Sequence, residues 1–220
     1  ATDTLASMAQ RPLLLSGFMA TGKSTLGAAL AARYDVPFVD TDDVIAREAR
    51  STVAELWARE GEAAFREREA RTVERLLDDA RPSVIAVGGG AMTNVALRRS
   101  ALERAVVVTL RASPATILAR AGDLTSRPNL RGADPARRID HLLSIRAEAY
   151  AECHGWVDTD DVDLDAAMDA VDAIVRRDPL AVPLGARTYT VDVVRDDPTR
   201  LTDAIASLCP SSLVVVSDSN

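Results

Sequence analysis

The 220-residue sequence lacks the features that mark nucleic-acid, membrane and secreted proteins. Acidic side chains outnumber basic ones and give a formal charge of -7, whereas a nucleic-acid-binding face carries an excess of Lys and Arg. There is no long uncharged apolar run and no signal-peptide pattern. The two cysteines, Cys153 and Cys209, match neither a metal nor a redox spacing, and we expect reduced thiols. These absences predict a soluble, cytoplasmic protein without nucleic-acid or membrane partners.

Short apolar runs alternate with helical patterns along the chain, and 47% of the residues are hydrophobic. The patterns predict strands at 13–15, 36–39, 83–87, 105–110 and 156–158, and helices at 26–33, 52–59, 62–77, 114–121, 136–152 and 165–177. A T-x-x-E capping box opens the second helix, and Gly61 closes it. Strands that alternate with crossover helices predict an α/β fold with a parallel sheet covered on both faces. Ligands of such a sheet gather beyond the carboxyl ends of its strands.

The motif G-x-x-x-x-G-K-S runs from Gly17 to Ser24, between a predicted strand and a predicted helix. In that setting the backbone N–H groups form an anion nest, and the helix start adds partial positive charge. Lys23 is then placed to reach the terminal phosphates of a nucleotide, and the Ser24 hydroxyl to bind Mg²⁺. The alternative is an ordinary glycine turn. The agreement of motif and context favours phosphate binding.

Two acidic side chains flank Thr41 directly after the second predicted strand. Asp40 is a candidate Mg²⁺ ligand, directly or through water, because Mg²⁺ keeps several waters and takes few carboxylates. Asp42 is a candidate for orienting an acceptor hydroxyl or taking its proton. A helix N-cap explains one acid in this cluster but not two.

Gly88, Gly89 and Gly90 follow the third predicted strand, where they allow either a tight turn or the close approach of a ligand to the backbone. Arg66 lies at helical spacing from acidic side chains, so a solvated ion-pair surface is its simplest explanation, and the same caution applies to Arg146. A guanidinium group is nevertheless suited to bidentate binding of a carboxylate.

The stretch GDLTSRPNLRG, at residues 122–132, has the composition of a lid. Arg127 is a candidate for stabilising the charge of the transferring phosphoryl group while the lid excludes water. The alternative is a surface loop without a catalytic role.

The chain contains, in order, GFMATGKST, FVDTD, EGEAAFREREA, AVGGGA, TSRP, IRAEAY and WVDT. This series resembles the shikimate kinases, small P-loop kinases of aromatic amino-acid biosynthesis, over residues 13–176. The resemblance implies the sheet order 2-3-1-4-5, an ATP-dependent transfer to the 3-hydroxyl of shikimate, and Mg²⁺ as cofactor.

The resemblance also implies residue roles. ATP is expected at Gly17, Ala20, Thr21, Gly22, Lys23, Ser24, Thr25, Arg120 and Arg127, with Arg120 near the adenine; shikimate at Asp42, Arg66, Gly88, Gly89, Gly90 and Arg146; Mg²⁺ at Ser24 and Asp40; and catalysis at Lys23, Asp42 and Arg127. One residue departs from the family, whose loop usually has glycine at the position of Ala20. If that position needs a positive φ, the alanine is strained.

Three segments are expected: a disordered lead at 1–10, the kinase-like domain at 11–178, and a tail at 179–220. The tail contains VPLGARTYTVDVV, which predicts half-exposed strands joined near Gly185, and it resembles the truncated start of 3-dehydroquinate synthase, as in a fused, multifunctional enzyme. The alternative is a β-rich extension that packs on the kinase or mediates association. The kinase domain itself is expected to be monomeric.

The sequence thus predicts a shikimate kinase. The competing hypotheses are a P-loop kinase for another small anionic polyol or a nucleotide, and a nucleotide-binding regulatory domain without turnover.

Overall fold

The computed structural model describes residues 11–79, 81–122 and 134–191. Five parallel strands form the central sheet: β1 (Leu13–Gly17), β2 (Phe38–Asp40), β3 (Val84–Ala86), β4 (Val106–Arg111) and β5 (Gly155–Asp158). Their order, β2-β3-β1-β4-β5, confirms the expected order 2-3-1-4-5. Because β1 is central, the loop that follows it lies in the middle of the carboxyl edge of the sheet.

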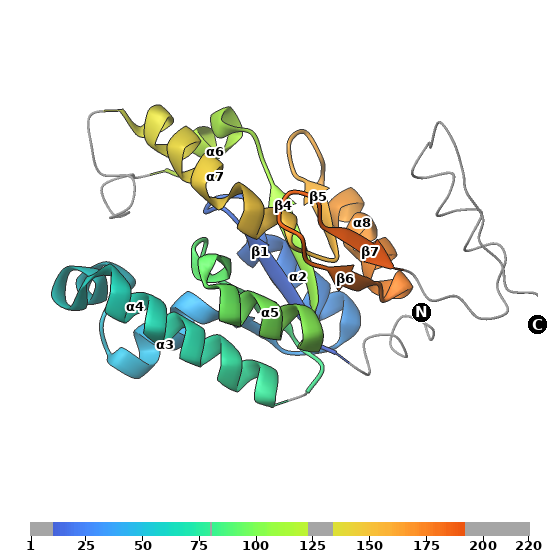
Figure 1. Ribbon diagram of the computed structural model, residues 1–220, viewed down its shortest axis with the longest axis horizontal. Coiled ribbons are helices and arrows are strands. Elements are labelled where there is room, and N and C mark those ends of the chain that lie inside the picture. Colours follow the sequence, from blue (N-terminus) through green and yellow to red (C-terminus); the bar gives the residue numbers. More distant parts are fainter. Residues whose placement is uncertain (1–10, 80, 123–133, 192–220) are drawn as a thin grey trace, which may run out of the picture.

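Helices cover both faces of the sheet (Figure 1). Leu13 and Leu15 of β1 pack toward α2 (Lys23–Tyr34) and α8 (Leu164–Arg177), whereas Leu14 packs toward α4 (Val53–Asp78) and α5 (Val95–Arg104). All three leucines are at most 1% exposed. Complete burial of such a side chain contributes about 2 kcal/mol, so this alternation anchors the central strand from both sides.

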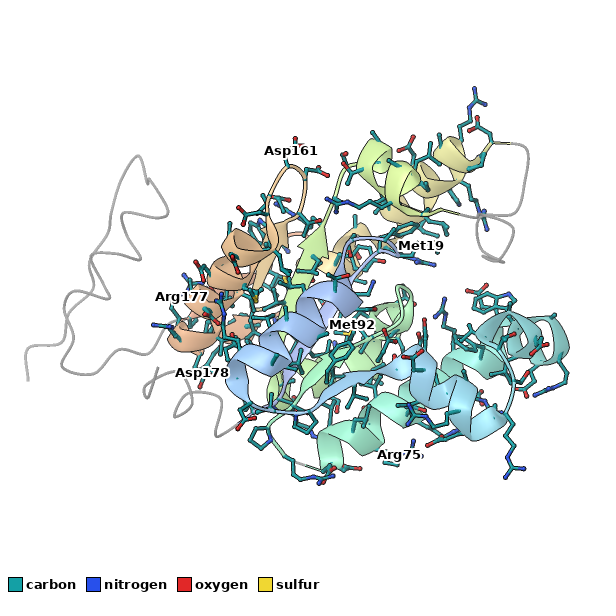
Figure 2. All side chains as sticks on the ribbon, turned by 180° about the vertical axis from the view of Figure 1, so that it is seen from behind. Met19, Arg75, Met92, Asp161, Arg177 and Asp178 are labelled. Atoms are coloured by element: carbon teal, nitrogen blue, oxygen red, sulfur yellow. The ribbon has the colours of Figure 1, made fainter. Side chains whose placement is uncertain are left out.

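Two further helices, α6 (Pro114–Arg120) and α7 (Pro135–Ala151), pack against the loop after β1. Phe18 of that loop is buried with Ile117 of α6 and with Ile139 and Leu142 of α7. Figure 2 shows Met19 and Asp161 toward the carboxyl edge of the sheet, whereas Asp178 lies toward the opposite end. The loop after β1 is therefore supported by apolar packing at its first residue.

Two helices were not expected from the sequence. The first, α3 (Thr41–Ala49), begins directly after β2, and Asp40 caps it by accepting a hydrogen bond from the Asp42 N–H. The second, α5, is capped by Asn94 and carries the charged Arg98 on its buried face, beside Leu97 and Leu102, which interrupts the apolar pattern that marks a helix. Strand β2 is also displaced from the predicted 36–39, because Asp40 still belongs to it.

The helices expected at 52–59 and 62–77 meet in α4, which is interrupted at Gly61 with a φ of 80° and a ψ of 171°. The predicted capping box is confirmed, since Thr52 Oγ1 accepts from the Glu55 N–H at 3.2 Å and Glu55 Oε2 accepts from the Thr52 N–H at 2.8 Å. Gly61 therefore ends the first helical segment, as predicted, without separating it from the second by a loop. No helix in the described ranges is long and apolar enough to span a membrane.

The predicted strands of the tail are present as an antiparallel pair, β6 (Leu180–Val182) and β7 (Tyr189–Val191), and Gly185 lies in the connection between them. Ala181 packs against the core cluster that α4 and α5 form on the sheet. The lead at 1–10 and the rest of the tail at 192–220 lie outside the described residues.

Candidate active site

The loop after β1 has the backbone of a phosphate-binding loop. Gly17 has a φ of 130°, and a Cβ atom there would lie 2.2 Å from the Leu110 carbonyl oxygen. Gly22, with a φ of 93°, precedes α2 without a side-chain cap. The first N–H groups of the helix are therefore not bonded to a capping side chain. They can donate hydrogen bonds to an anion at this position.

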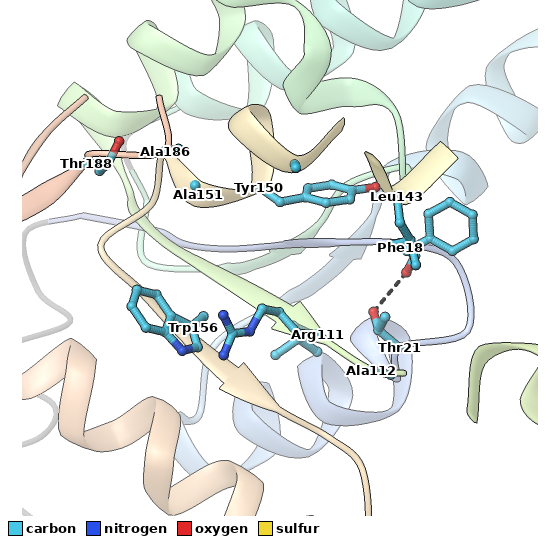
Figure 3. A pocket seen from close by; sticks show the side chains of 12 residues that line it. Phe18, Thr21, Arg111, Ala112, Leu143, Tyr150, Ala151, Trp156, Ala186 and Thr188 are labelled. Carbon is cyan, nitrogen blue, oxygen red and sulfur yellow. Dashed lines mark hydrogen bonds between the residues drawn. The ribbon is translucent and has the colours of Figure 1, made fainter. Parts of the chain in front are cut away.

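Side chains brace this loop from within. The Phe18 carbonyl oxygen accepts a hydrogen bond from Lys23 Nζ at 2.7 Å and from Thr21 Oγ1 at 2.8 Å. Lys23 Nζ also donates to the Gly17 carbonyl oxygen at 3.0 Å. Figure 3 shows the contact between Thr21 and Phe18, which is buried. The ammonium group therefore lies across the loop in which a phosphate is expected.

Ala20 has a φ of 62°, in the left-handed region that glycine adopts more easily. For an L-residue this conformation costs about 1 kcal/mol. The strain suspected from the sequence is therefore present in the fold.

Two oxygen ligands lie together where β2 ends. Ser24 Oγ donates to Asp40 Oδ2 at 2.7 Å, so both atoms can reach one cation. This donor set fits Mg²⁺, which takes hard oxygen ligands from one or two protein groups and fills its octahedron with water and substrate phosphate. Within the described residues there is no cluster of three acidic, His or Cys side chains that would form a complete protein cage.

Asp42, in the first turn of α3, has a buried carboxylate oxygen, Oδ1, without a hydrogen-bond partner among the described residues. Burial raises the pKa of this carboxyl group, and repulsion from Asp40 adds to the effect. The positive charges of Lys23 and Arg66 oppose it. A buried acceptor of this kind is suited to receive a hydrogen bond, and then the proton, from a substrate hydroxyl.

Arg66 pairs with an acid at each of its two helical spacings, as the simplest sequence interpretation expected. Its Nε atom lies 3.7 Å from Oε1 of the exposed Glu62, but the second partner, Glu69, is buried. The Arg66 side chain is 19% exposed, and its Nη1 donates at 2.5 Å to Glu69 Oε2, whose side chain is 1% exposed. The guanidinium carbon lies 5.1 Å from the Trp57 ring centroid and 5.6 Å from that of Phe65. These contacts hold the guanidinium group in a fixed orientation, which a bidentate carboxylate site requires.

Glu69 is a site residue that the sequence analysis missed. Burial raises the pKa of its carboxyl group, while Arg66 opposes the shift. Its Oε1 atom is buried without a partner among the described residues and lies 2.0 Å from the place of a Cβ on Gly88. The Arg66–Glu69 spacing was visible in the sequence, but their burial depends on the packing of α4 against the sheet.

The three glycines after β3 are each required by a close neighbour. Besides the contact of Gly88 with Glu69, a Cβ on Gly90 would lie 2.3 Å from Arg66 Nη2, and one on Gly89 would lie 3.2 Å from the Met19 nitrogen. We call Gly88–Gly90 the glycine loop. It separates the phosphate loop from the Arg66–Glu69 pair, and a side chain on Gly88 or Gly90 would displace the Glu69 carboxylate or the Arg66 guanidinium group.

Helix α7 completes this arrangement from the other side. Arg146 is 5% exposed, its Nη1 donates to the Gly89 carbonyl oxygen at 2.8 Å, and its guanidinium carbon lies 5.5 Å from the Phe18 ring centroid. The Tyr150 hydroxyl group donates to the same carbonyl oxygen. Tyr150 was also missed, although its spacing of four residues from Arg146 places both on one helix face.

A cavity of about 440 Å³ brings the phosphate loop together with Asp42, and it is lined by Met19, Ala20, Gly22, Lys23, Ser24, Thr25, Asp40, Asp42, Val87, Gly88, Gly89 and Arg120. Arg66, Gly90 and Arg146 are not among its lining residues. Arg120 is held by two hydrogen bonds to Thr159, at 3.1 Å to its hydroxyl and 2.7 Å to its carbonyl oxygen. Predicted nucleotide and acceptor residues therefore meet in one space. Arg127 and the rest of the predicted lid, at 123–133, lie outside the described residues.

Comparison with known proteins agrees with this geometry. The family model for shikimate kinase matches residues 19–176. The shikimate kinase of Caulobacter vibrioides is 36% identical over 176 residues, which are 80% of this chain and 88% of that protein. That of Bradyrhizobium diazoefficiens is 38% identical over 160 residues, 73% of this chain and 77% of that protein.

Solved structures agree as well. The shikimate kinase from Acinetobacter baumannii in complex with shikimate has a TM-score of 0.70 at 30% identity, covering 79% of this chain and 95% of its own. The shikimate kinase from Bacteroides thetaiotaomicron has a TM-score of 0.69 at 27% identity, with coverage of 76% and 98%. On this sequence and structural similarity, the chain belongs to the shikimate kinase family.

Proposed function

We propose that this chain transfers the γ-phosphoryl group of ATP to the 3-hydroxyl of shikimate, giving shikimate 3-phosphate and ADP. The observation that carries the proposal is the single cavity in which the phosphate loop faces Asp42 across the glycine loop. Family membership supports the substrate assignment.

On the nucleotide side, the N–H groups of the phosphate loop and the start of α2 hold the phosphates, and Lys23 neutralises their charge. Arg120 faces the same cavity and is our candidate for stacking on the adenine. Ser24 and Asp40, which lie together, would hold Mg²⁺, and the ion would supply positive charge that neutralises the phosphates. We assign charge stabilisation during transfer to Arg127, in the predicted lid.

On the acceptor side, we assign the carboxylate of shikimate to the Arg66 and Arg146 guanidinium groups, and its hydroxyls to Asp42 and the glycine loop. In the transfer step, the acceptor oxygen forms a bond to the γ-phosphorus while Asp42 takes the hydroxyl proton. The bond from the γ-phosphorus to the bridging oxygen breaks, and its electron pair stays on ADP. Asp42 is suited to accept this proton because burial already raises the pKa of its carboxyl group.

A coupled assay of ADP release tests this proposal. We expect ADP release that requires shikimate. The KM for the methyl ester of shikimate should be much higher than that for shikimate, because the ester has no carboxylate charge to pair with Arg66 and Arg146. Tight ATP binding without shikimate-dependent turnover would instead favour the regulatory domain. Turnover that is faster with another anionic polyol would assign that substrate.

The remaining assignments stay predictions. These are the cytoplasmic location, the monomeric kinase domain and association through the tail. The family match ends at residue 176, so the resemblance of the tail to 3-dehydroquinate synthase also stays a prediction.

A further inference from the structure

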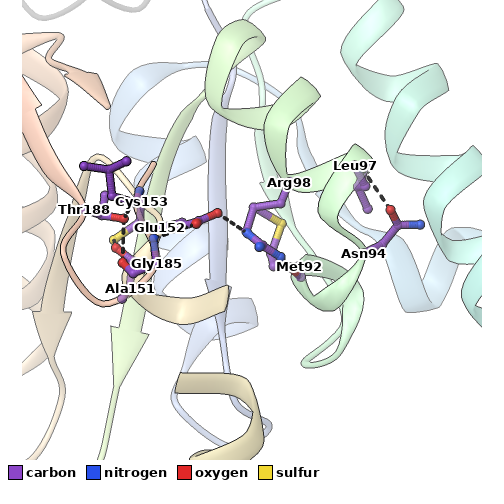
Figure 4. Close-up of polar contacts among 10 residues, drawn as sticks. Met92, Asn94, Leu97, Arg98, Ala151, Glu152, Cys153, Gly185 and Thr188 are labelled. Carbon is purple, nitrogen blue, oxygen red and sulfur yellow. Dashed lines mark hydrogen bonds and ion pairs between the residues drawn. The ribbon is translucent and has the colours of Figure 1, made fainter. Parts of the chain in front are cut away.

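The turn between β6 and β7 is hydrogen-bonded to the carboxylate of Glu152, the residue after α7. The Gly185 N–H donates to Glu152 Oε1 at 2.8 Å, and Arg98 Nε donates to Glu152 Oε2 at 2.5 Å. Arg98 Nη1 in turn donates to the Met92 carbonyl oxygen at 2.6 Å. Figure 4 shows this chain of contacts, which runs from the tail through α7 to α5. We call it the Glu152 relay.

Two members of the relay, Met92 and Glu152, lie next to segments that contact the glycine loop. Met92 lies in the short helix η1 (Ala91–Thr93), which is closed onto the glycine loop by Ala91 N–H to Gly88 O at 3.0 Å and Thr93 N–H to Gly90 O at 3.1 Å. Glu152 is the residue after α7, the helix that places Arg146 and Tyr150 on the Gly89 carbonyl oxygen. The relay therefore ties the tail to both segments that shape the acceptor side.

The relay is sheltered from solvent. The side chains of Arg98 and Glu152 are 9% and 12% exposed. A surface ion pair contributes little because water screens it, whereas a sheltered charge that loses its partner is costly. Weakening the hydrogen bond from Gly185 should therefore shift the Glu152 carboxylate and, through it, the Arg98 guanidinium group.

The turn itself has a defined shape. Gly185 has a φ of 62°, and Thr188 Oγ1 accepts from the Leu184 N–H at 3.1 Å while donating to the Gly185 carbonyl oxygen at 2.7 Å. These contacts fix the direction of the Gly185 N–H. Residues of the same turn, Ala186 and Thr188, line a second cavity of about 450 Å³, together with Phe18 and Tyr150 (Figure 3).

We propose that the 184–188 turn is a positioning element of the acceptor site, which acts through the Glu152 relay on the glycine loop. Arg98 and Glu152 are positioning residues, since they touch neither ATP nor shikimate in the arrangement proposed above. The glycine loop packs directly against the acceptor side, because Glu69 and Arg66 lie in the space that side chains on Gly88 and Gly90 would fill. A small displacement of the loop therefore changes the acceptor site before it changes the nucleotide site.

The test rests on the proposed function and uses the full chain with three variants. Thr188→Val removes the hydroxyl that shapes the turn, Glu152→Gln removes the charge of the relay, and Arg187→Gln is the control, because its side chain lies in the same turn and is exposed. We expect Thr188→Val and Glu152→Gln each to raise the KM for shikimate about 3- to 10-fold, the range for losing one such hydrogen bond. The KM for ATP and kcat should stay within about twofold, as should all constants of the control.

The double variant decides whether the turn acts through Glu152. If it does, Thr188→Val adds little to Glu152→Gln, and the combined effect is smaller than the product of the single effects. Lower thermal stability with an unchanged KM for shikimate would overturn the proposal, as would effects that multiply. Wild-type protein without shikimate-dependent turnover would overturn the proposed function as well, whereas wild-type turnover with an insensitive KM would contradict the relay alone.

Discussion

The two sides of the cavity are built in different ways. The phosphate side consists of consecutive residues, Gly17 to Thr25, and its conformation depends on backbone angles and short-range hydrogen bonds. The acceptor side combines side chains from α3, α4 and α7 with the glycine loop. A local motif is therefore recognisable from sequence alone, whereas an assembled site depends on how distant elements pack.

The two sides also differ in their burial. On the phosphate side Ser24 and Thr25 are exposed, and the loop binds through N–H groups. On the acceptor side Glu69 is 1% and Arg146 5% exposed, so charges are held in a dry environment. Buried charges depend strongly on their partners, so we expect substitutions on the acceptor side to affect function more than substitutions on the phosphate side.

The largest expected effect is that of Asp42→Asn. The amide cannot take the hydroxyl proton, so kcat should fall by about 100- to 10,000-fold. The affinity for ATP, measured by titration calorimetry, should stay within about twofold, because the phosphate side is intact. Equal loss of ATP affinity in a folded variant would show that the two sides are not separable.

The second largest effect is expected for Arg66→Lys. This variant should raise the KM for shikimate about 10- to 100-fold, because an ammonium group cannot form the planar, bidentate contact with a carboxylate. The matched control is Arg71→Lys on the same helix, where Arg71 is 71% exposed and lies 3.8 Å from Glu67. An unchanged KM for shikimate in Arg66→Lys would contradict the carboxylate assignment.

Thr21→Val tests the phosphate side. The substitution keeps the shape of a buried side chain and removes its hydrogen bond to the Phe18 carbonyl oxygen. We expect the KM for ATP to rise about 3- to 10-fold, with the KM for shikimate as the internal reference. A larger effect on shikimate than on ATP would contradict the division into two sides.

Asp42→Asn should also increase thermal stability at neutral pH. Burial raises the pKa of the Asp42 carboxyl group above that of the unfolded chain, so the ionised form disfavours folding at pH values above the raised pKa. As the pH falls below the unfolded value, both states carry the proton and the penalty disappears. The melting temperature of the variant should therefore exceed that of the wild type at pH 7, and the difference should shrink toward pH 3.

The exposed neighbour provides the control for this experiment. Asp43→Asn removes an exposed charge from the same helix turn, and because Asp43 is only the smallest of the contributions that raise the pKa of the Asp42 carboxyl group, its pH-dependent gain should be much smaller. A stability gain for Asp42→Asn that is independent of pH would contradict burial of the charge as its cause.

The smallest expected effect is that of Ala20→Gly. Glycine removes the strain of the positive φ, worth about 1 kcal/mol, but it also makes the unfolded chain more flexible, which costs about 0.4 to 1 kcal/mol. The melting temperature should change by a few degrees at most, and the KM for ATP should hold within about twofold. A clear loss of stability would show that the Ala20 methyl group stabilises the loop by packing.

Much of the fold was predictable because its signals are local. Apolar runs, the capping box at Thr52 and Glu55, and the glycine-bounded loop specify their own segments within a few residues. Helices α3 and α5 were missed because their local signals were ambiguous. The acidic cluster at the start of α3 was weighed as a helix cap and interpreted mainly as a site, and α5 has the charged Arg98 on its buried face. Asp40 caps α3 and is also the proposed metal ligand. The sequence alone does not distinguish between these two roles.

By itself, the sequence determined the phosphate loop, the alternation of strands and helices, and most of the residues proposed for the acceptor site. Only the tertiary structure decided that Glu69 contacts Arg66, that Tyr150 contacts the Gly89 carbonyl oxygen and that Glu152 contacts the tail. The physical reason is that a backbone conformation depends on neighbouring residues, whereas burial of a charge depends on which elements pack around it. The Arg66–Glu69 pair is identical in sequence to a solvated surface pair, and only its surroundings make it part of a site.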